Sequence, residues 1–584
     1  MQPALLLATS WLIGLTFALP LKAETQETAI PLCRNSTTLL TNATFITLDP
    51  KQPQAKALAL SNQRIVALGD PQVLEANCRG KDTQVIDLKG AVVVPGFIDT
   101  HSQFLFYGWL ADHALDLSTT NVFQRADWQP IKTTEEFLTA IKNTKPQSKL
   151  GAVKEETASQ NSTAKKEWLI VNGYDPARMM GPPLTQKMLD ETEPNQALIV
   201  FYSSGQQAMV NQVAAKKLAS QEQGDKIQIN NEGLIQNKAL QSLIKQLISP
   251  EEATQAIETA AKLYAKQGYT TITEAQAHPE WLASYENLTN KVNFPLDVVL
   301  NPTTIPEKQR IDVIYLDNPR LYSGPMIVEF DGLAHEHRAY FTHTYLPEGG
   351  VTGRGNLNYP PKELEKLLLD AVHAKVSIAI ESNGDAALDL ALNLINKVQL
   401  LHKEAAFRPL MFNAEFARND QLQRMHQLGL KVSWFSPQLY YWGDAFCQKI
   451  LGPRFAAQAN PLTTAQKILG AINIHANSPA TPPLPLQMMQ FVNSAQIQNW
   501  YFPPTKQCPK QFWTNEDLSS DKALRALTLE AAKFYSLEKD KGALMPGKLA
   551  DMTILGANPL TTKNLDNIKV LGTIARGQLH LNHE

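Results

Sequence analysis

The fold is decided by one stretch of the sequence, Val92-Val93-Val94-Pro95-Gly96-Phe97-Ile98-Asp99-Thr100-His101. Before it, the chain consists of short apolar segments that are separated by turns. After it, strand patterns alternate with amphipathic helical patterns. The stretch therefore marks the boundary between two kinds of architecture.

The N-terminal side of this boundary predicts a small β-domain. Apolar segments at residues 39–48, 57–60 and 64–69 each end at a turn, which is typical of short strands. The end of the chain has the same character at residues 552–555 and 570–577. We therefore expect one composite β-sandwich that is built from both chain ends, residues 24–95 plus 540–584.

The region between these ends, residues 96–539, predicts a parallel sheet. Strand-like apolar runs lie at residues 168–171, 197–201, 270–273, 298–300, 376–380 and 431–434, and helical patterns cover residues 251–267 and 361–374. Strands that alternate with helices form parallel sheets, so we expect an α/β fold with a (β/α)8 TIM-like barrel. Residues 145–166, rich in Lys, Glu, Ser and Ala, are expected to form a surface insertion.

A second motif lies near the end of the chain, Lys541-Gly542-Ala543-Leu544-Met545-Pro546-Gly547-Lys548-Leu549-Ala550-Asp551. Together with the opening stretch, it resembles the amidohydrolase superfamily, family 3 branch. Further matches follow in the expected order at residues 205–214, Asp331-Gly332, Gly384-Asp385 and residues 424–429. The resemblance implies a hydrolase that acts on carbon–nitrogen bonds, other than peptide bonds, of a small molecule.

The resemblance also implies a divalent metal, such as zinc, at the carboxyl ends of the barrel strands. The family binds it through an H-x-H pair, further histidines, a bridging lysine and a general-base aspartate. Only the first histidine is present here, as His101. The other positions fall on Gln103, Gln206, Glu381 and Asn413 (histidines), Ile327 (lysine) and Asn477 (the aspartate).

These replacements define two hypotheses. Amides bind transition metals poorly and take up no proton near neutral pH, and His101 plus Glu381 are fewer than the three protein ligands typical of catalytic zinc. We therefore favour a catalytically impaired relative, or pseudoenzyme, whose pocket binds a small molecule without a metal. The alternative is an active hydrolase with zinc or another divalent metal, in a site rebuilt from His101, Glu381 and the His335/His337 pair.

Three further residues near the strand ends are pocket candidates. His475 lies two residues before Asn477, and Asp331 stands where the resemblance implies a structural or substrate-facing carboxylate. Glu329 and Asp331 are an alternative carboxylate pair for acid–base chemistry. We expect Asp331 to line the pocket, whereas His475 either points into the pocket as well or is a core histidine.

Two motifs near the barrel mouth leave alternatives open. His335 and His337 form either a displaced metal site or part of a solvent-exposed polar loop. Tyr440, Tyr441 and Trp442 either stack on an aromatic or sugar-like ligand or pack a lid over the pocket.

The overall composition excludes several functional classes. The chain has 584 residues, 43% of them hydrophobic, and a formal net charge of -2, so no electrostatic case exists for nucleic-acid binding. Neither a glycine-rich phosphate loop before a helix nor a G-x-S-x-G motif occurs. The sequence leaves the oligomeric state open.

The N-terminus predicts export. Residues 5–19 are mostly apolar, and Leu21-Lys22-Ala23 offers a signal-peptidase site, so residues 1–23 are expected to be a signal peptide. An uncleaved anchor is the alternative, although the apolar run is shorter than the ~20 residues that a span needs. We expect a periplasmic protein of a Gram-negative bacterium, with no membrane insertion after cleavage.

The cysteine count fits an oxidising compartment. Cys33 and Cys78 flank the first strands, whereas Cys447 and Cys508 lie near the C-terminal end of the barrel region. Four cysteines allow three pairings, and we favour Cys33–Cys78 with Cys447–Cys508 because each pair lies within one region. The alternative is four unpaired thiols in a reducing compartment.

Overall fold

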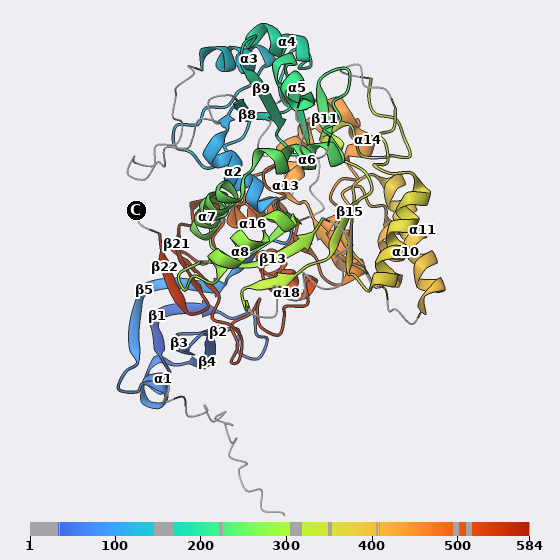
Figure 1. Ribbon diagram of the computed structural model, residues 1–584. Coiled ribbons are helices and arrows are strands. Elements are labelled where there is room, and N and C mark those ends of the chain that lie inside the picture. Colours follow the sequence, from blue (N-terminus) through green and yellow to red (C-terminus); the bar gives the residue numbers. More distant parts are fainter. Residues whose placement is uncertain are drawn as a thin grey trace, which may run out of the picture.

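The computed structural model describes residues 33, 36–144, 168–220, 226–303, 318–347, 353–403, 407, 409–494, 502–509 and 517–582. The expected signal peptide, residues 1–23, and the expected insertion, residues 145–166, lie outside the described residues. Figure 1 shows three layers: a sheet from both chain ends, a central array of barrel strands, and an inserted sheet at the far side.

The sheet at the chain ends confirms the predicted composite. Its order is β22-β21-β20-β5-β1-β3-β4, with β2 beside β1. β5 pairs in parallel with β1 and antiparallel with β20, so strands from the two ends of the chain are direct neighbours. The strands are β1 (Thr38–Ile46), β2 (Gln54–Ala55), β3 (Ala57–Ser61), β4 (Arg64–Gly69), β5 (Gln84–Pro95), β20 (Met552–Leu555), β21 (Val570–Ala575) and β22 (Gln578–Leu581).

Both faces of this sheet are covered by apolar side chains. Successive strand residues point to opposite faces, so Leu39 packs with Leu74 of α1 (Pro71–Cys78), whereas Leu40 packs on the other face with Met552. A disulfide joins Cys33, just before β1, to Cys78 at the end of α1. This is one of the two pairings that the sequence favours.

The central array consists of parallel strands whose carboxyl ends share one side. Its hydrogen-bonded orders are β14-β13-β12-β6 and β15-β16-β17-β18-β19. β14 leads directly into β15 through Gly324-Pro325. After β19, the Asn477 N–H donates to the His101 carbonyl at 3.1 Å, which brings the last strand beside the first. The strands are β6 (Phe97–Ile98), β12 (Tyr269–Ala277), β13 (Asp297–Pro302), β14 (Leu321–Ser323), β15 (Met326–Glu329), β16 (Ile378–Ser382), β17 (Leu410–Asn413), β18 (Lys431–Trp434) and β19 (Asn473–Ile474).

Helices follow the barrel strands, as the alternating sequence pattern predicts. α7 starts with a capping box at Ser249 and Glu252, and its buried residues recur at helical spacing from Ala253 to Tyr264. The main helices of this kind are α2 (Phe104–His113), α7 (Pro250–Lys266), α8 (Leu282–Thr289), α10 (Pro361–Ala374), α11 (Asp385–Leu401), α12 (Asn419–Gln427), α15 (Leu462–Leu469), α16 (Pro485–Ser494), α17 (Ser520–Ala526) and α18 (Leu529–Phe534).

Two of the strands that the sequence assigns to the barrel lie elsewhere, so that part of the prediction was wrong. β8 (Trp168–Tyr174) and β9 (Ala197–Tyr202) pair in parallel within a separate five-stranded sheet, with β7 (Leu115–Asp116), β10 (Gln207–Val210) and β11 (Leu234–Gln236). After β9 the chain reverses at Gly205, which has a φ of 68°, and returns antiparallel as β10. A short apolar run does not reveal which sheet the strand will join.

A second disulfide joins Cys447 to Cys508, as the sequence favours. Cys447 lies in the π-helical turn Phe446–Ile450, and both cysteines belong to an apolar cluster with Phe435, Tyr441 and Trp442. Within the described part of the chain, we find no helix with the length and apolar character needed to cross a bilayer.

Candidate functional site

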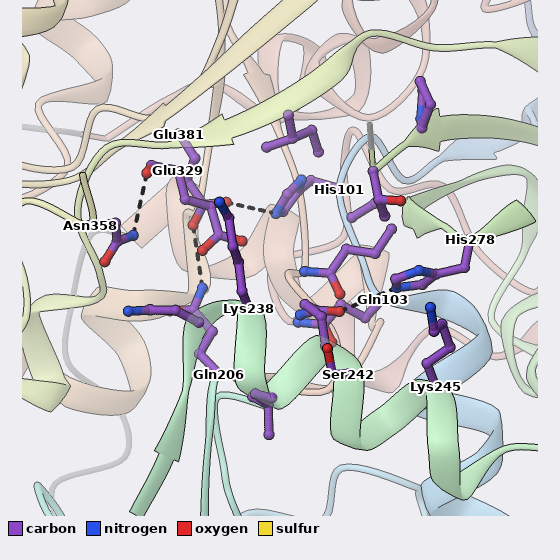
Figure 2. Close-up of a pocket in the computed structure, with 18 of the residues that line it drawn as sticks. His101, Gln103, Gln206, Lys238, Ser242, Lys245, His278, Glu329, Asn358 and Glu381 are labelled. Atoms are coloured by element: carbon purple, nitrogen blue, oxygen red, sulfur yellow. Dashed lines mark hydrogen bonds and ion pairs between the residues drawn. The ribbon is translucent and has the colours of Figure 1, made fainter. Parts of the chain in front are cut away.

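A cavity of about 500 Å³ opens at the carboxyl ends of the barrel strands. Active and binding sites of (β/α)8 barrels lie at this end. The floor is formed by residues that follow the strands, and one wall by α6 (Asn237–Leu247), which comes from the inserted region (Figure 2). Residues on its surface include His101, Gln103, Gln206, Ile327, Glu329, Glu381 and Asn477 from the predicted site, and Lys238, Ser242, Lys245, Gln276 and Arg338.

His101 is positioned by a buried carboxylate. Asp99 accepts hydrogen bonds from the Ser102 hydroxyl at 2.6 Å and from the backbone N–H of Ala476 at 3.3 Å. These bonds fix the turn after β6, so the His101 ring lies against Phe412 with 4.4 Å between centroids. His101 Nε2 is 3.4 Å from a Glu381 oxygen, while its buried Nδ1 has no partner among the described residues.

Glu381 is the centre of a hydrogen-bonded network of replaced metal positions. Its Oε1 accepts from the side-chain amides of Asn413 at 3.0 Å and Gln206 at 3.5 Å, and its Oε2 faces His101 (Figure 2 shows the Gln206 and His101 interactions). Glu381 is 1% exposed. Because a buried carboxylate needs donors, these neighbours stabilise its charge.

The network continues beneath the floor through neutral groups. Asn413 Oδ1 lies 3.1 Å from His475 Nε2, and His475 Nδ1 lies 2.8 Å from the Ser433 hydroxyl. Complete burial lowers the pKa of His475 well below its ordinary value, so the imidazole is neutral, with Nε2 as donor and Nδ1 as acceptor. Asn413 and His475 therefore lie behind Glu381, which corrects the prediction that they line the cavity and agrees with the alternative of a core histidine at His475.

Gln103 and Asn477 line the cavity, and each has one polar atom that is shielded from solvent. Both are buried, and neither Gln103 Oε1 nor Asn477 Nδ2 has a partner among the described residues. Asn477 has a φ of 55°, a left-handed conformation that asparagine tolerates.

Glu329 is paired with Glu381 and not, as the sequence suggested, with Asp331. The two glutamates are register partners on β15 and β16, and Glu329 is the half-buried one that faces the cavity. Burial and the neighbouring Glu381 raise the pKa of Glu329 to about 7, partly opposed by Arg338. The floor therefore carries two adjacent carboxyl groups.

Asp331 has a structural role, which corrects its assignment as a pocket residue. Its carboxylate accepts three backbone N–H groups, those of Tyr340, Asn383 and Gly384, each at 2.8 Å. These bonds tie the loop after β15 to the loop after β16. Asp331 consequently has no place on the cavity surface.

His335 and His337 form neither the displaced metal site nor an exposed loop. His335 is 1% exposed and stacks on Trp442 with 4.0 Å between ring centroids, and burial lowers its pKa to about 3. His337 has a left-handed backbone and packs its ring 5.0 Å from Tyr345. The two imidazoles contact different aromatic partners because this segment is a turn and not a strand.

The aromatic segment after β18 packs against neighbouring aromatic rings, and Tyr440, Tyr441 and Trp442 do not line the cavity. Trp442 stacks on His335 and donates from Nε1 to Asp175 at 2.9 Å. Tyr440 stacks on Phe491 at 3.7 Å. These contacts join the barrel mouth to the inserted region.

One wall of the cavity, formed by α6 and a loop arginine, is absent from the sequence-based prediction. Leu240, Leu243 and Ile244 of α6 are buried, so Lys238 and Lys245 lie on the opposite, cavity side. Arg338 bridges the wall and the floor, since its guanidinium donates to Asn237 at 2.6 Å and to Gln206 at 3.4 Å. The polar spacing on residues 238–245 is the signal that could have identified this wall.

The residues at the implied metal position do not fit a catalytic divalent metal. His101 and Glu381 are the two strong donors there, and Glu381 is already bound by two amides and the imidazole. In residues 36–144, 168–220, 226–303 and the other described ranges, no three His, Cys, Asp or Glu side chains are arranged to hold a metal ion.

Comparison with known proteins places this fold and site in a family. The model of the amidohydrolase family, in its third subdivision, matches residues 84–580, which is most of the chain. The chain therefore belongs to amidohydrolase family 3, as its two terminal motifs indicate. The family's enzymes are hydrolases, and its barrel pocket is a site for small molecules.

Individual relatives are distant but cover nearly the whole length. The chain is 23% identical to Protein LONG AFTER FAR-RED 3 of Arabidopsis thaliana, with 92% of this chain and 91% of the relative covered. It is 21% identical to the N-substituted formamide deformylase of Arthrobacter pascens, with 93% and 97% covered. A solved metal-dependent hydrolase of Pyrococcus horikoshii has the same fold, with a TM-score of 0.66, 20% identity, and coverage of 90% of this chain and 99% of that one.

Proposed function

We propose that this protein is an exported member of the family that binds a small polar molecule in its barrel pocket without metal-dependent hydrolysis. One observation carries the proposal: Glu381, at a metal-ligand position, is enclosed by Asn413, Gln206 and His101. Carboxamides in the place of histidine ligands neither bind a catalytic metal well nor act as a general base.

The same residues are suited to recognition. Gln103 and Asn477 line the cavity, and the Gln103 Oε1 acceptor and the Asn477 Nδ2 donor are buried without partners among the described residues. A buried polar group without a partner costs free energy, so a ligand that pairs with both amides gains affinity and selectivity. A pocket of about 500 Å³ is of the usual size for a small molecule.

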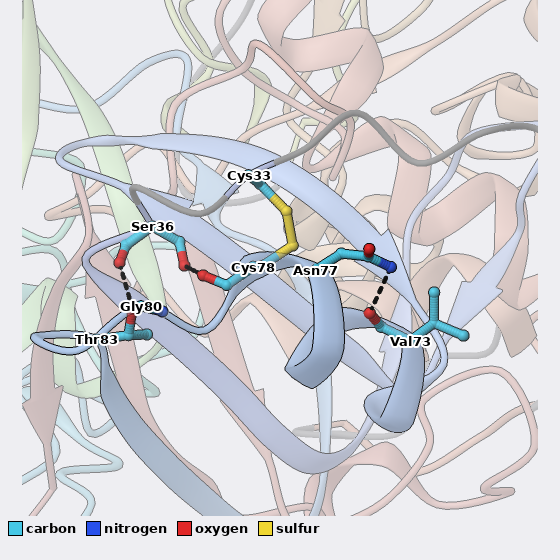
Figure 3. Close-up of a disulfide and its surroundings, with 7 residues drawn as sticks. All are labelled: Cys33, Ser36, Val73, Asn77, Cys78, Gly80 and Thr83. Carbon is cyan, nitrogen blue, oxygen red and sulfur yellow. Dashed lines mark hydrogen bonds between the residues drawn. A yellow bond between two sulfur atoms is a disulfide. The ribbon is translucent and has the colours of Figure 1, made fainter.

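Two features support export to an oxidising compartment, which we propose is the periplasm of a Gram-negative bacterium. The apolar run at residues 5–19 has the form of a signal peptide. The Cys33–Cys78 bond (Figure 3) and the Cys447–Cys508 bond use all four cysteines, and disulfides persist outside reducing cytosol. N-terminal sequencing of the protein from a periplasmic extract should begin at Glu24.

The second candidate function is metal-dependent hydrolysis of a carbon–nitrogen bond at a rebuilt site. Family membership favours it, and His101 and Glu381 lie within 3.4 Å of each other as its remaining donors. The two histidines that this alternative could have used, His335 and His337, pack instead against Trp442 and Tyr345.

Metal analysis of a restored variant tests the proposal. The triple variant Gln103→His/Gln206→His/Asn477→Asp returns three ligand types to the cavity, and Gln103→Asn/Gln206→Asn/Asn477→Gln is its amide-only control. After growth in zinc-supplemented medium, we expect less than ~0.1 equivalent of metal in wild type and control and roughly one in the restored variant, by plasma mass spectrometry. About one equivalent in the wild type, lost on Glu381→Gln, would instead establish the rebuilt hydrolase site.

A further inference from the structure

We infer that the cavity binds a small zwitterion, whose ammonium group contacts Glu329 and Glu381 and whose carboxylate contacts Lys238. This inference rests on the proposed function, because the ammonium group takes the place that a metal cation has in a family hydrolase. The substrate or ligand class is thus a short chain with a primary amine at one end and a carboxylate at the other.

The floor of the cavity presents two adjacent carboxyl groups that would bind a cation. Glu329 and Glu381 are register neighbours on adjacent strands, and both face the cavity. The donors to Glu381 are two amides and one imidazole. The Arg338 guanidinium, whose charge also acts on Glu329, is shared with a third carboxylate, since it lies 3.6 Å from Glu336. Like charges at such close range need a positive partner, which an ammonium with three N–H donors supplies.

The His101 imidazole is a further polar group on the floor. Its Nε2 lies 3.4 Å from a Glu381 oxygen, and its Nδ1 is buried without a partner among the described residues. Gln103, 8% exposed, lines the same cavity, and its Oε1 is also buried without a partner among the described residues. A rotation of the Gln103 amide would bring this acceptor to an ammonium N–H, so the floor offers more than a pair of acidic side chains.

The opposite wall supplies a cation for the carboxylate end. Lys238 extends from α6 toward the floor (Figure 2), with its Nζ 5.1 Å from the Tyr359 ring centroid. No carboxylate of the described ranges comes within ion-pair distance of it. Lys245, about two helical turns further along α6, is different because Glu280 lies 3.2 Å from its ammonium group. Lys238 is therefore the lysine available to an anionic ligand group.

The surface of the cavity is also apolar in part. Leu240, Ala275, Pro279, Pro302 and Ile327 line the same cavity. A methylene chain between the ammonium and the carboxylate would bury apolar area against these residues. The lining thus favours a two-ended ligand over a compact ion such as inorganic phosphate.

Calorimetric titration of the mature protein tests the inference. The ligands are the straight-chain ω-amino acids from β-alanine to aminohexanoate, with pentylamine and pentanoate as one-ended controls. We expect one of the ω-amino acids to bind about tenfold more tightly than either control, since each charged hydrogen bond contributes more than a neutral one. Equal or tighter binding of a one-ended control would overturn the inference.

Reciprocal variants assign the two ends. Lys238→Met should weaken the best ω-amino acid and pentanoate about fivefold and leave pentylamine unchanged, while Glu329→Gln should weaken the ω-amino acid and pentylamine and leave pentanoate unchanged. Lys262→Met, at an exposed lysine of α7 outside the cavity, is the control. Equal losses for all three ligands in both variants would contradict the assignment.

Metal content, measured on the same preparation, separates the two hypotheses. A metal-free protein without preference for two-ended ligands overturns the zwitterion inference and leaves the proposed function standing. One equivalent of bound metal overturns the proposed function and the inference together, because the metal would occupy the ammonium position.

Discussion

Two buried polar clusters lie at opposite ends of the barrel strands and are built from opposite kinds of side chain. At the carboxyl ends is the pocket network of His101, Gln206, Glu381, Asn413 and His475. At the amino end of β13 is the joint cluster of Asp297, Arg320, Lys541, Asp551 and Arg576, where the chain returns to the composite sheet. The first has one carboxylate among neutral groups, whereas the second is made entirely of charges.

The difference shows which cluster is complete without a ligand. In the joint cluster, Asp297 lies 2.7 Å from Lys541 and 2.8 Å from Arg576. Burial alone would raise the pKa of Asp297, but Lys541 and Arg576 hold it below its ordinary value. Its charges are matched within the chain, so it acts as a fixed joint. In contrast, Glu381 of the pocket network and its neighbour Glu329 face a cavity, which suits reversible binding.

The largest expected effect is in the joint cluster. Lys541→Met leaves the buried carboxylates of Asp297 and Asp551 without their shared lysine, and we expect about 3–5 kcal/mol less free energy of unfolding. Lys366→Met, which breaks an exposed pair with Asp370, should change it by less than about 0.5 kcal/mol. Urea denaturation of both variants is the measurement, and similar losses would refute the view that the joint is a structural core.

An intermediate effect on stability is expected at His335, which is buried against Trp442. Its folded pKa is lowered to about 3 by burial, so the unfolded chain binds a proton first as the pH falls. The stability that neutral His335 provides is complete above its ordinary pKa and is lost as the pH falls from about 6.5 toward 3, amounting to roughly 2 kcal/mol at pH 5.

His335→Phe keeps the ring stacked on Trp442 and removes this loss. The melting temperature of the variant minus that of the wild type should therefore be higher at pH 5 than at pH 7.5. Scanning calorimetry of both proteins at the two pH values is the measurement. A difference between the two proteins that is the same at both pH values would mean that His335 does not carry the acid sensitivity.

The smallest effect is expected in the pocket network. Glu381→Gln keeps an oxygen that accepts from Asn413 and Gln206, so the free energy of unfolding should change by less than about 1 kcal/mol. Asn413→Asp is the contrasting change, because it places a second carboxylate against Glu381 and should lower the melting temperature more. The melting temperatures of both variants are the measurement. A larger decrease for Glu381→Gln than for Asn413→Asp would mean that the pocket network depends on the charge of Glu381, as the joint cluster depends on its charges.

The sequence predicts those parts of the site that follow directly from strand ends. His101, Glu381 and Asn477 each follow or end a barrel strand, and the parallel arrangement brings their side chains to one floor. Asn413 and His475 follow strands too, yet they lie beneath the floor. Their depth depends on the angle of each turn, which strand patterns do not encode.

Other features depend on contacts between distant segments. The Arg576–Asp297 and Arg338–Gln206 hydrogen bonds join residues that are far apart in the chain. The spacing of residues within a short segment cannot predict such pairs. β8 and β9 have the same apolar character as barrel strands, but the antiparallel β10 and β11 place them in another sheet. Local pattern therefore predicts the type of element more reliably than its partner.

The position of β20 between β5 and β21 has a consequence for synthesis on the ribosome. β5 is made early, but its neighbour β20 begins at Met552, so one edge of β5 stays open until almost the whole chain has emerged. An uncovered strand edge is prone to pair with another chain. Chains truncated before Met552 should therefore aggregate more readily than the full-length protein, because the edge of β5 that β20 covers stays open.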